Sequence, residues 1–524
     1  MTAPRALVFT GFMGAGKSTA ARTVDPGALD TDALFEREHG PIAAYFERSG
    51  EAAFREREEA VVLGALDRGC VVALGGGALG SARVREALRD HTVVWLEVTE
   101  EEAWARAAGH DRPLTRDRAA FAALHTGREA AYEAAADAIL PPVDRGVVVR
   151  ALPALRALRP GERLLWAHTA SGEYPVWAGE SAWPEIGEGD VVVSDEIVGE
   201  LYAERFARSA AASHGGAPVP GDAPAPDAPS APGGAPALPA TPILIRPGEV
   251  HKTLATAQQV WEAMVVAGLT RSGRVVAVGG GVVGDLAGFC AATYQRGVPV
   301  VHVPTNIVAQ VDSAYGGKTG VDLPQAKNYV GAYHQPAAVH VVPSTLDTLP
   351  AAEHAAGYAE VVKTALIAGG ALWARVERGE AVDAAMVLAC ARTKLAVVRA
   401  DERDGGRRQV LNLGHTVGHA LETATGYGAL RHGEAVALGL LAAMRLSGQD
   451  ALRARVRELL RDAGLPVALP VGVDPGEVVA LTRRDKKRTG ARTPFVLVAE
   501  PGDVRHGQDV ADDDLRAAVA ELTP

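Results

Sequence analysis

The chain has 524 residues, of which 48% are hydrophobic and 22% charged, and its formal net charge is −11. This length exceeds what one hydrophobic core supports, so we expect two or three globular domains. The negative charge argues against a nucleic-acid-binding or membrane-binding surface, so any anion site must be built locally. The three cysteines form no CxxC pair, and no apolar run approaches the roughly 18 residues of a membrane span. These features predict a cytoplasmic protein without a disulfide framework.

Lysine is rare in this chain, and its positions are informative. Only eight of the 53 residues that are Lys or Arg are lysines. After Lys17 the next lysine is Lys252, and most of the others lie beside glycine-rich or histidine-rich segments. Because arginine supplies most positive charges here, each lysine predicts a position that needs a compact ammonium group. The lysines therefore mark candidate sites.

The first predicted domain, residues 1–162, alternates short apolar runs with helical patterns. The runs at 6–9, 71–74 and 93–96 predict buried strands of βαβ units. Directly after the first run, Gly11-Phe-Met-Gly-Ala-Gly-Lys-Ser18 fits the P-loop pattern GxxxxGK[ST]. Backbone N–H groups of such a loop surround phosphate, the lysine reaches the terminal phosphates, and the serine hydroxyl binds Mg²⁺. The motif predicts nucleotide binding without choosing among kinases, GTPases and ATPases.

Later features indicate the phosphate acceptor. Asp30-Thr-Asp32 points two carboxylates to one side of an extended segment, where one can serve Mg²⁺ and the other a substrate hydroxyl. Phe54-Arg55 and Gly75-Gly-Gly77 offer a guanidinium and exposed backbone to a small anion, and separated arginines follow at Arg112 and Arg128. Singly, each could be a solvated surface residue. Together and in this order they resemble shikimate kinase over essentially all of residues 1–160.

This resemblance implies a role for each matching residue. The nucleotide would be held by Gly14, Ala15, Gly16, Lys17, Ser18 and Thr19, with Ser18 and Asp30 serving the Mg²⁺ of ATP. Shikimate would be bound by Asp32, Arg55, Gly76, Gly77 and Arg128. Asp32 would orient or deprotonate the acceptor hydroxyl, and Arg112 would come from a lid and stabilise the transferring phosphate. Gluconate-type kinases are the nearest competing interpretation, since they share the P-loop.

A second alternating region, residues 163–346, predicts a Rossmann-like α/β domain. Its candidate buried strands lie at 191–193, 243–245, 275–278 and 300–303. An Ala/Pro/Gly-rich insertion at 209–241 cannot form a core, which predicts a disordered surface loop. From 347 to 524 the pattern is mainly helical and predicts an all-α domain.

Two motifs of this second region carry chemistry. Gly279-Gly-Gly-Val-Val-Gly284 follows a predicted strand and matches GxGxxG, a weak dinucleotide signal because no acidic ribose ligand follows about 20 residues later. His415 and His419 lie at i, i+4 on one helical face, with His432 nearby and Glu360 as a fourth candidate ligand. Spacing alone pairs His415 with His419. For each histidine, a hydrogen-bonding or core role is an equal alternative.

At these residues the stretch from about 170 to the end resembles 3-dehydroquinate synthase, a sugar-phosphate cyclase. The resemblance implies Zn²⁺ or Co²⁺ on Glu360, His415 and His432, with His419 contacting substrate instead. It implies an NAD site made by Asp195, Glu249, Lys252, Gly280, Gly281, Asp285, Thr305, Asn306, Asp312, Lys318, Lys327, Thr345 and Thr348. It further implies substrate contacts from Lys318, Lys363, Lys394, Arg296, Asn328, Arg408 and Asn412, joined by Lys486 or Lys487. Asn306 stands where the family usually has threonine.

The two resemblances together predict a bifunctional enzyme of the shikimate pathway. One half would phosphorylate shikimate with Mg²⁺ and ATP. The other would use NAD⁺ and a metal to cyclise 3-deoxy-D-arabino-heptulosonate 7-phosphate to 3-dehydroquinate with release of phosphate. Another sugar-phosphate cyclase of secondary metabolism, or one half serving as a non-catalytic scaffold, is the alternative. The resemblance also implies a homodimer through the synthase half and small molecules as the partners.

Overall fold

The computed structural model describes residues 5–68, 70–107, 117–144, 146–206, 242–426, 429–482 and 494–523. The chain forms two compact units: the first comprises residues up to His168 with Glu173–Trp177, and the second comprises Thr169–Gly172 with Ala178 onward. The domain divisions expected after residues 162 and 346 stay predictions. The lid residue Arg112, the insertion at 209–241, and Lys486 and Lys487 lie outside the described residues. Within the described ranges, no helix is both long and apolar enough to cross a membrane.

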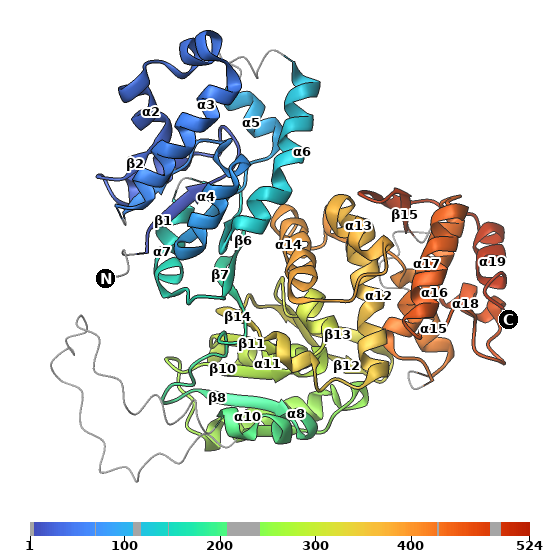
Figure 1. Cartoon of the computed structure of the whole chain (residues 1–524). Coiled ribbons are helices and arrows are strands. Elements are labelled where there is room, and N and C mark those ends of the chain that lie inside the picture. Colours follow the sequence, from blue (N-terminus) through green and yellow to red (C-terminus); the bar gives the residue numbers. More distant parts are fainter. Residues whose placement is uncertain are drawn as a thin grey trace, which may run out of the picture. The chain divides into compact units, whose positions relative to one another are not determined.

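The first unit is built on a largely parallel sheet flanked by helices (Figure 1). Its strands stand in the order β2-β3-β1-β4-β5-β6-β7, and neighbours from β2 to β6 are parallel. The strands are β1 (Leu7–Thr10), β2 (Leu29–Asp30), β3 (Val71–Ala73), β4 (Thr92–Leu96), β5 (Ala138–Leu140), β6 (Arg163–Thr169) and β7 (Gly172–Ala178). The helices are α1 (Lys17–Val24), α2 (Thr31–His39), α3 (Ile42–Leu66), α4 (Ala82–Ala87), α5 (Glu100–Ala107), α6 (Arg118–Ala135) and α7 (Val147–Ala157). Parallel pairing follows from the alternation of strands with crossover helices.

The second unit begins with a Rossmann-like layer. Its parallel strands stand in the order β14-β11-β10-β8-β9. The strands are β8 (Val191–Asp195), β9 (Ile243–Ile245), β10 (Val275–Gly279), β11 (Val300–Pro304) and β14 (Ala338–Val341), with α8 (Glu196–Leu201), α10 (Leu254–Val266) and α11 (Gly281–Thr293) between them. A separate antiparallel pair is formed by β12 (Lys318–Leu323) and β13 (Ala326–Tyr333). The four strands expected from the sequence are confirmed.

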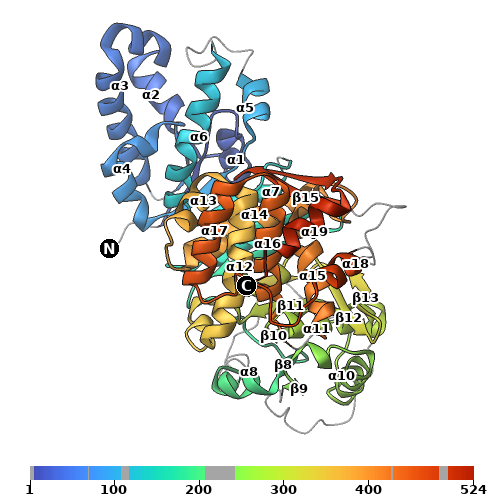
Figure 2. The same cartoon turned by 90° about the vertical axis from the view of Figure 1, so that its right-hand side faces the viewer.

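The rest of the second unit is mainly helical, and its helices gather into one bundle (Figure 2). They are α12 (Ala351–Ala368), α13 (Gly370–Glu377), α14 (Ala384–Ala400), α15 (His415–Ala424), α16 (His432–Leu446), α17 (Asp450–Asp462), α18 (Pro475–Thr482) and α19 (Asp512–Ala520). One hairpin, β15 (Phe495–Glu500) with β16 (Asp503–Gln508), interrupts the expected all-α pattern. Its strands meet at a Pro-Gly turn, 501–502, which favours a hairpin over a helix.

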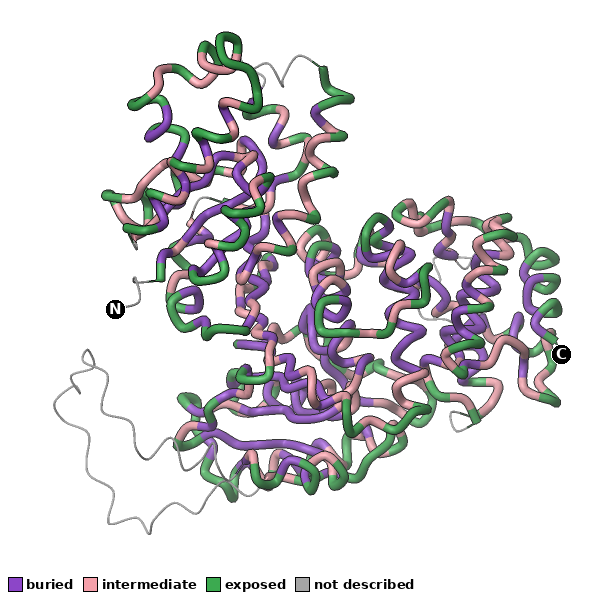
Figure 3. The backbone as a smooth tube through the Cα atoms, viewed as in Figure 1, coloured by how far each residue is buried: buried purple, intermediate pink, exposed green. Residues whose placement is uncertain are grey.

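Burial follows the sheets and the central helices (Figure 3). Every residue of β4, β10 and β11 is buried. Strands covered on both faces carry continuous apolar runs, as these valine-rich segments do. In the bundle, most residues of α12 and α16 are buried. Polar side chains that point inward from these two helices therefore sit in a dry environment.

Candidate active sites

The P-loop lies between β1 and α1, directly after the first strand. Gly16 has a φ of 85° and caps α1, a backbone conformation that residues with a Cβ rarely adopt. This turn leaves the helix N-terminus open to an anion. The ammonium of Lys17 donates to the carbonyl of Phe12 at 3.1 Å, which holds the lysine over the loop.

A cavity of about 210 Å³ adjoins the P-loop. It is lined by Gly14, Ala15, Gly16 and Thr19, and by residues that the sequence did not indicate, among them Glu97, Arg106 and Pro141–Asp144. Arg106 donates to the carbonyl of Gly14 at 2.9 Å, so it is tied to the loop itself. The sequence carried no signal for these residues because they reach the P-loop only through the fold. The cavity has the position expected of a nucleotide site.

Two side chains of α6 contact the glycine segment that follows β3. Arg128 donates to the carbonyl of Gly76 at 3.0 Å, and the hydroxyl of Tyr132 donates to the same oxygen at 2.8 Å. Both side chains come from α6, one turn apart, so the helix aims them at a single point. Arg128 was expected there, whereas Tyr132 was not.

The other predicted acceptor residues approach the same glycine segment. The carboxylate of Asp32 lies against Gly75 and the guanidinium of Arg55 against Gly77, so closely that a Cβ at either glycine would collide with it. Glu58 accepts from Arg55 at 2.6 Å and is buried. Its position at i+3 from Arg55 on one helix was the available sequence signal.

The Mg²⁺ role expected of Ser18 and Asp30 stays a prediction. Asp30 caps α2, where one carboxylate oxygen accepts from the backbone of Asp32 and Ala33 at 3.1 and 3.3 Å. Its other oxygen lies 3.7 Å from Arg22. The carboxylate thus stands at the N-terminus of α2 and faces a side chain of α1, the helix that follows the P-loop.

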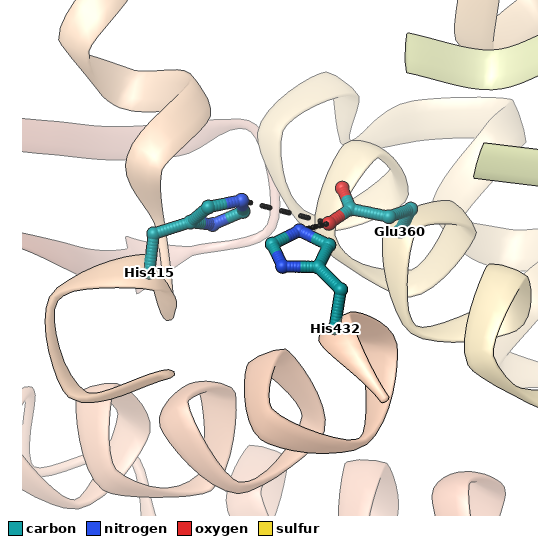
Figure 4. Close-up of side chains that lie close together, drawn as sticks. All are labelled: Glu360, His415 and His432. Carbon is teal, nitrogen blue, oxygen red and sulfur yellow. Dashed lines mark ion pairs between the residues drawn. The ribbon is translucent and has the colours of Figure 1, made fainter. Parts of the chain in front are cut away.

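Glu360, His415 and His432 come together from α12, α15 and α16 (Figure 4). The Nε2 atoms of His415 and His432 lie 3.6 and 3.4 Å from Oε1 of Glu360. One ligand atom from each residue lies within 4.8 Å of the others. Spacing suggested that His415 and His419 bind one ion together, but neither candidate group of the described residues contains both. His419 falls in a second group, with Glu422 and His432.

Both histidines of the first group are the first residues of their helices, so the backbone of the preceding loop sets the direction of each side chain. Gly414 precedes His415 with a φ of 78°. The carbonyl of Leu413 lies 3.1 Å from Nδ1 of His415, so this nitrogen carries the proton and Nε2 is left as the free ligand atom. That arrangement is typical of a metal-binding imidazole.

The charges of this group suit a metal ion. Burial would raise the pKa of Glu360, but the Lys363 ammonium and His432 outweigh it and lower the pKa to about 2. Burial, aided by Lys363, holds the pKa of His415 well below its ordinary value. Burial would lower the pKa of His432 too, but hydrogen bonds with Glu360 and Glu422 raise it to about 10. The group therefore offers an ionised carboxylate and a neutral imidazole, and metal binding would displace a proton from His432.

The donor set fits Zn²⁺ or Co²⁺. Two imidazoles and one carboxylate form a catalytic type of site, in which three protein ligands leave a position for substrate. Oε2 of the buried Glu360 is ion-paired with Lys363, and Oε1 faces the Nε2 atoms of both imidazoles. A carboxylate oxygen that shares its position with two imidazole nitrogens is an arrangement that a metal cation would complete.

Two buried lysines flank the metal-binding group. Lys363 is ion-paired with Glu360 and lies 2.9 Å from Asp312. Lys394 is ion-paired with the other oxygen of Asp312. Burial lowers the pKa of Lys394 to about 8, against the opposing effect of Asp312. The cluster can therefore present two ammonium groups to an anionic substrate.

A cavity of about 550 Å³ lies beside these clusters. Among the predicted residues, it is lined by Glu249, Lys252, Gly281, Asp285, Asn306, Asp312, Lys327, Asn328, His419 and His432. The buried Lys252 joins three of them, since its Nζ lies 2.8 Å from Glu249, 3.2 Å from Asp285 and 2.9 Å from Oδ1 of Asn328. The fold thus brings predicted cofactor and substrate residues to one cavity.

The glycine loop after β10 is part of this arrangement. A Cβ on Gly280 would collide with the side-chain amide of Asn306, so this side chain packs directly on the glycine backbone. The amide of Thr305 donates to the carbonyl of Gly279 at 3.0 Å. Asp195 ends β8, the strand next to β10, and caps α8 through the amides of Ile197 and Val198. Asp195 therefore stands at the same sheet edge as the glycines, where α/β folds bind nucleotides.

Several predicted residues do not line the cavity. Arg296 is exposed and follows the end of α11 opposite to the glycine loop, roughly 20 Å along the helix. Lys318 pairs with Asp404 at 2.7 Å. Arg408 is buried and donates to the carbonyl of Gly316 at 3.0 Å. Asn412, Thr345 and Thr348 also lie outside the lining, and Thr348 hydrogen-bonds Tyr202. The lining likewise lacks Asp195, Gly280, Thr305, Glu360, Lys363, Lys394 and His415.

Glu422 and Asp322 are site residues that sequence reasoning missed. Glu422 is buried, lines the cavity and contacts both His432 and Lys327. Asp322 accepts from the backbone of Asn328 at 2.7 Å. The signal for Glu422 was its place at i+3 from His419 on α15, on the face that carries the histidines.

Comparison with known protein families finds matches in both halves of the chain. Residues 13–146 match the model of shikimate kinase. Residues 242–356 match the N-terminal model of 3-dehydroquinate synthase, and residues 357–488 match its C-terminal model. The 3-dehydroquinate synthase of Halorhodospira halophila is 40% identical over 363 residues, which cover 65% of this chain and 94% of that protein. That of Pseudomonas putida is 39% identical over 378 residues, which cover 67% of this chain and 97% of that protein.

Solved structures of other sugar-phosphate cyclases share the fold of the second unit. A 2-deoxy-scyllo-inosose synthase, solved with carbaglucose-6-phosphate, NAD⁺ and Co²⁺, has a TM-score of 0.57 and 23% identity over 68% of this chain and all of that one. A 2-epi-5-epi-valiolone synthase from Streptomyces hygroscopicus, solved with NAD⁺ and Zn²⁺, has a TM-score of 0.57 and 26% identity over 67% of this chain and 96% of that one. The dehydroquinate synthases are much closer in sequence than these cyclases. The chain therefore belongs to the 3-dehydroquinate synthase family and is a bifunctional shikimate-pathway enzyme, with a shikimate kinase domain ahead of the synthase.

Proposed function

We propose that the two halves use the residues described above to catalyse two separate reactions. The first unit would transfer phosphate from ATP to shikimate, giving shikimate 3-phosphate. The second would convert 3-deoxy-D-arabino-heptulosonate 7-phosphate to 3-dehydroquinate and phosphate. The observation that carries the second assignment is the grouping of Glu360, His415 and His432 beside a cavity that also contains Lys252 and Asp285.

In the kinase, the P-loop would hold ATP and Mg²⁺. Lys17 would turn from the carbonyl of Phe12 to the phosphates and neutralise charge that develops during transfer. Arg55 and Arg128, both held beside the glycine segment, would bind the carboxylate and hydroxyls of shikimate. Asp32 would accept the proton of the attacking hydroxyl or orient it. Arg112 would stabilise the transferring phosphate.

In the synthase, Glu360, His415 and His432 would hold Zn²⁺ or Co²⁺, and NAD⁺ would lie over the glycine loop near Asp195, Lys252 and Asp285. When bound, these groups supply reversible hydride transfer and polarisation of the substrate oxygens. Further cofactor contacts would come from Glu249, Gly280, Gly281, Thr305, Asn306, Asp312, Lys318, Lys327, Thr345 and Thr348.

The protein's own side chains would hold the substrate and manage its protons. Lys363 and Lys394 would bind its anionic groups, since both ammonium groups are already drawn to one point by Asp312. With a pKa near 8, Nζ of Lys394 can also exchange a proton close to neutral pH. His419 would contact substrate inside the cavity. Asn328 would join them from the cavity lining, and the resemblance implies the same role for Arg296, Arg408 and Asn412, which do not line the cavity.

Two assays on the full chain test this proposal. Phosphate release is measured with the seven-carbon substrate, NAD⁺ and Zn²⁺, with glucose 6-phosphate as the matched control substrate. Shikimate phosphorylation is measured with Mg²⁺ and ATP, with gluconate as the control acceptor. Turnover of only the seven-carbon substrate and shikimate is expected. Preferred turnover of glucose 6-phosphate would replace the synthase assignment by another cyclase, and an inactive half would be a scaffold.

Assembly and location belong to the same proposal. We infer a homodimer formed through the synthase half and a cytoplasmic location, the latter supported by free cysteines at Cys70, Cys290 and Cys390. Sedimentation of the full chain at several concentrations tests the first. A monomer at micromolar concentration would contradict it.

A further inference from the structure

Glu422 occupies a distinctive position between the metal-binding group and the cofactor residues. Its side chain is 4% exposed, and Oε1 lies 3.4 Å from Nδ1 of His432 and 3.1 Å from Nζ of Lys327. A buried carboxylate is retained only where charged or hydrogen-bonding partners satisfy it. Here the partners are one metal-binding histidine and one predicted cofactor lysine.

The two nitrogens of His432 face two different carboxylates. Nε2 lies 3.4 Å from Glu360, and Nδ1 lies 3.4 Å from Glu422. The nitrogens of an imidazole diverge, so one ring can offer Nε2 to the metal-binding group only while Nδ1 points away from it. The position of Glu422 determines which way the ring is turned.

Glu422 could instead be a ligand, because it forms a second possible metal-binding group with His419 and His432. The contacts argue against this role. Glu422 already has the Lys327 ammonium at hydrogen-bond distance, and a cation placed there would have to displace it. In Glu360 the Lys363 ammonium pairs with Oε2, whereas Oε1, the atom that faces the two imidazoles, is left for a cation. We therefore assign the metal to Glu360, whereas Glu422 faces Nδ1, the nitrogen of His432 that points away from Glu360.

We propose that Glu422 is a positioning residue, which accepts the Nδ1–H of His432 and thereby turns Nε2 toward the metal. This inference rests on the proposed metal site of the synthase. Carboxylates that orient metal-binding histidines typically contribute 10- to 100-fold to metal affinity.

The test is a Zn²⁺ titration of the full chain by competition with a chromophoric chelator, together with both activities. Glu422→Ala should weaken Zn²⁺ binding about 10- to 100-fold, and Glu422→Gln, whose amide oxygen can still accept from Nδ1, should recover part of that loss. Glu434→Gln is the matched control on the helix of His432, because Glu434 contacts Arg431 and caps the same helix. It should bind Zn²⁺ as wild type does. Shikimate kinase activity should be equal in all variants, and an unchanged melting transition of the second unit confirms that the synthase half is folded.

A further variant separates positioning from packing. Lys327→Ala removes the other partner of Glu422 but leaves its contact with His432, so Zn²⁺ affinity should change less than threefold, a margin of about 0.7 kcal/mol. Equal Zn²⁺ affinity in Glu422→Ala and wild type would overturn the proposal, as would Glu422→Gln and Glu422→Ala of equal affinity. If His415→Ala also bound Zn²⁺ like wild type, the proposed metal site itself would be wrong. This variant therefore distinguishes failure of the metal site from failure of the positioning role of Glu422.

Discussion

Asp312 balances the charge of two buried lysines of the synthase, so Asp312→Asn tests how much this charge balance stabilises the unit. Asp312 is ion-paired with both Lys363 and Lys394, which are 1% and 8% exposed. The substitution keeps the side-chain shape but removes the carboxylate that the two ammonium groups share, which leaves Glu360 to balance Lys363. Removing one partner of a buried ion pair costs about 3–5 kcal/mol. We expect about 3 kcal/mol, because Lys394 can lose its proton once Asp312 is gone.

Differential scanning calorimetry of the full chain measures this loss. A destabilisation of that size should lower the melting temperature of the synthase unit on the order of 5 °C, while the transition of the kinase unit serves as the internal control. Adding Lys394→Met to Asp312→Asn should restore at least half of the loss, because one cation then faces one carboxylate. A double variant less stable than Asp312→Asn would refute the charge-balance reasoning.

The loss should also depend on pH, with a defined sign. The pKa of Lys394 is lowered from 10.5 to about 8, chiefly by burial. Its ionisation therefore opposes folding, and the synthase unit gains stability as pH rises from about 8 toward 10.5. Without Asp312 the pKa of Lys394 falls further, so this gain begins at lower pH. The difference in unfolding free energy between wild type and Asp312→Asn should narrow between pH 7 and pH 9. A constant or growing difference would show that Lys394 does not cause the pH dependence.

Four further outcomes follow from the separate sites. Lys17→Ala should lower shikimate phosphorylation at least about 100-fold and leave 3-dehydroquinate synthesis unchanged, as coupled assays of both reactions would measure. His415→Ala should do the reverse, and loss of kinase activity in this variant would refute independent sites. Dialysis against a chelator should abolish phosphate release only, and added Zn²⁺ or Co²⁺ should restore it. Arg128→Lys should raise the KM for shikimate about tenfold without changing that for ATP, because lysine lacks the guanidinium fork; an unchanged KM for shikimate would remove Arg128 from the acceptor site.

Local pattern was sufficient where a strand, a turn and a helix follow one another in the chain. The valine runs of β10 and β11 and the P-loop after β1 were predictable for this reason. The metal-binding group was harder, because spacing identifies only neighbours on one helix. His415 and His419 satisfy i, i+4 geometry, but the packing of α16 against both α12 and α15 decides which side chains meet Glu360. Only the family resemblance selected His432.

Residues that act through other residues carried the weakest sequence signal. Glu58, Tyr132, Glu422 and Asp322 hold predicted site residues in place, and each reaches its partner through the fold or through helix geometry that many surface residues share. The rarity of lysine gave better guidance. Lys252, Lys363 and Lys394 are all buried and paired with carboxylates, as a need for compact ammonium groups implies.

The two reactions of this chain share a pathway but are not consecutive, so neither product is the substrate of the other half. The described kinase residues, from Lys17 to Arg128, belong to the first compact unit, and the cavity of the synthase is lined only by residues of the second. Each half thus has its own cavity and its own charged residues. Direct transfer of an intermediate would give no advantage between non-consecutive steps. The fusion therefore secures equal amounts of the two enzymes, and separately expressed halves should each retain the turnover number that they have in the full chain.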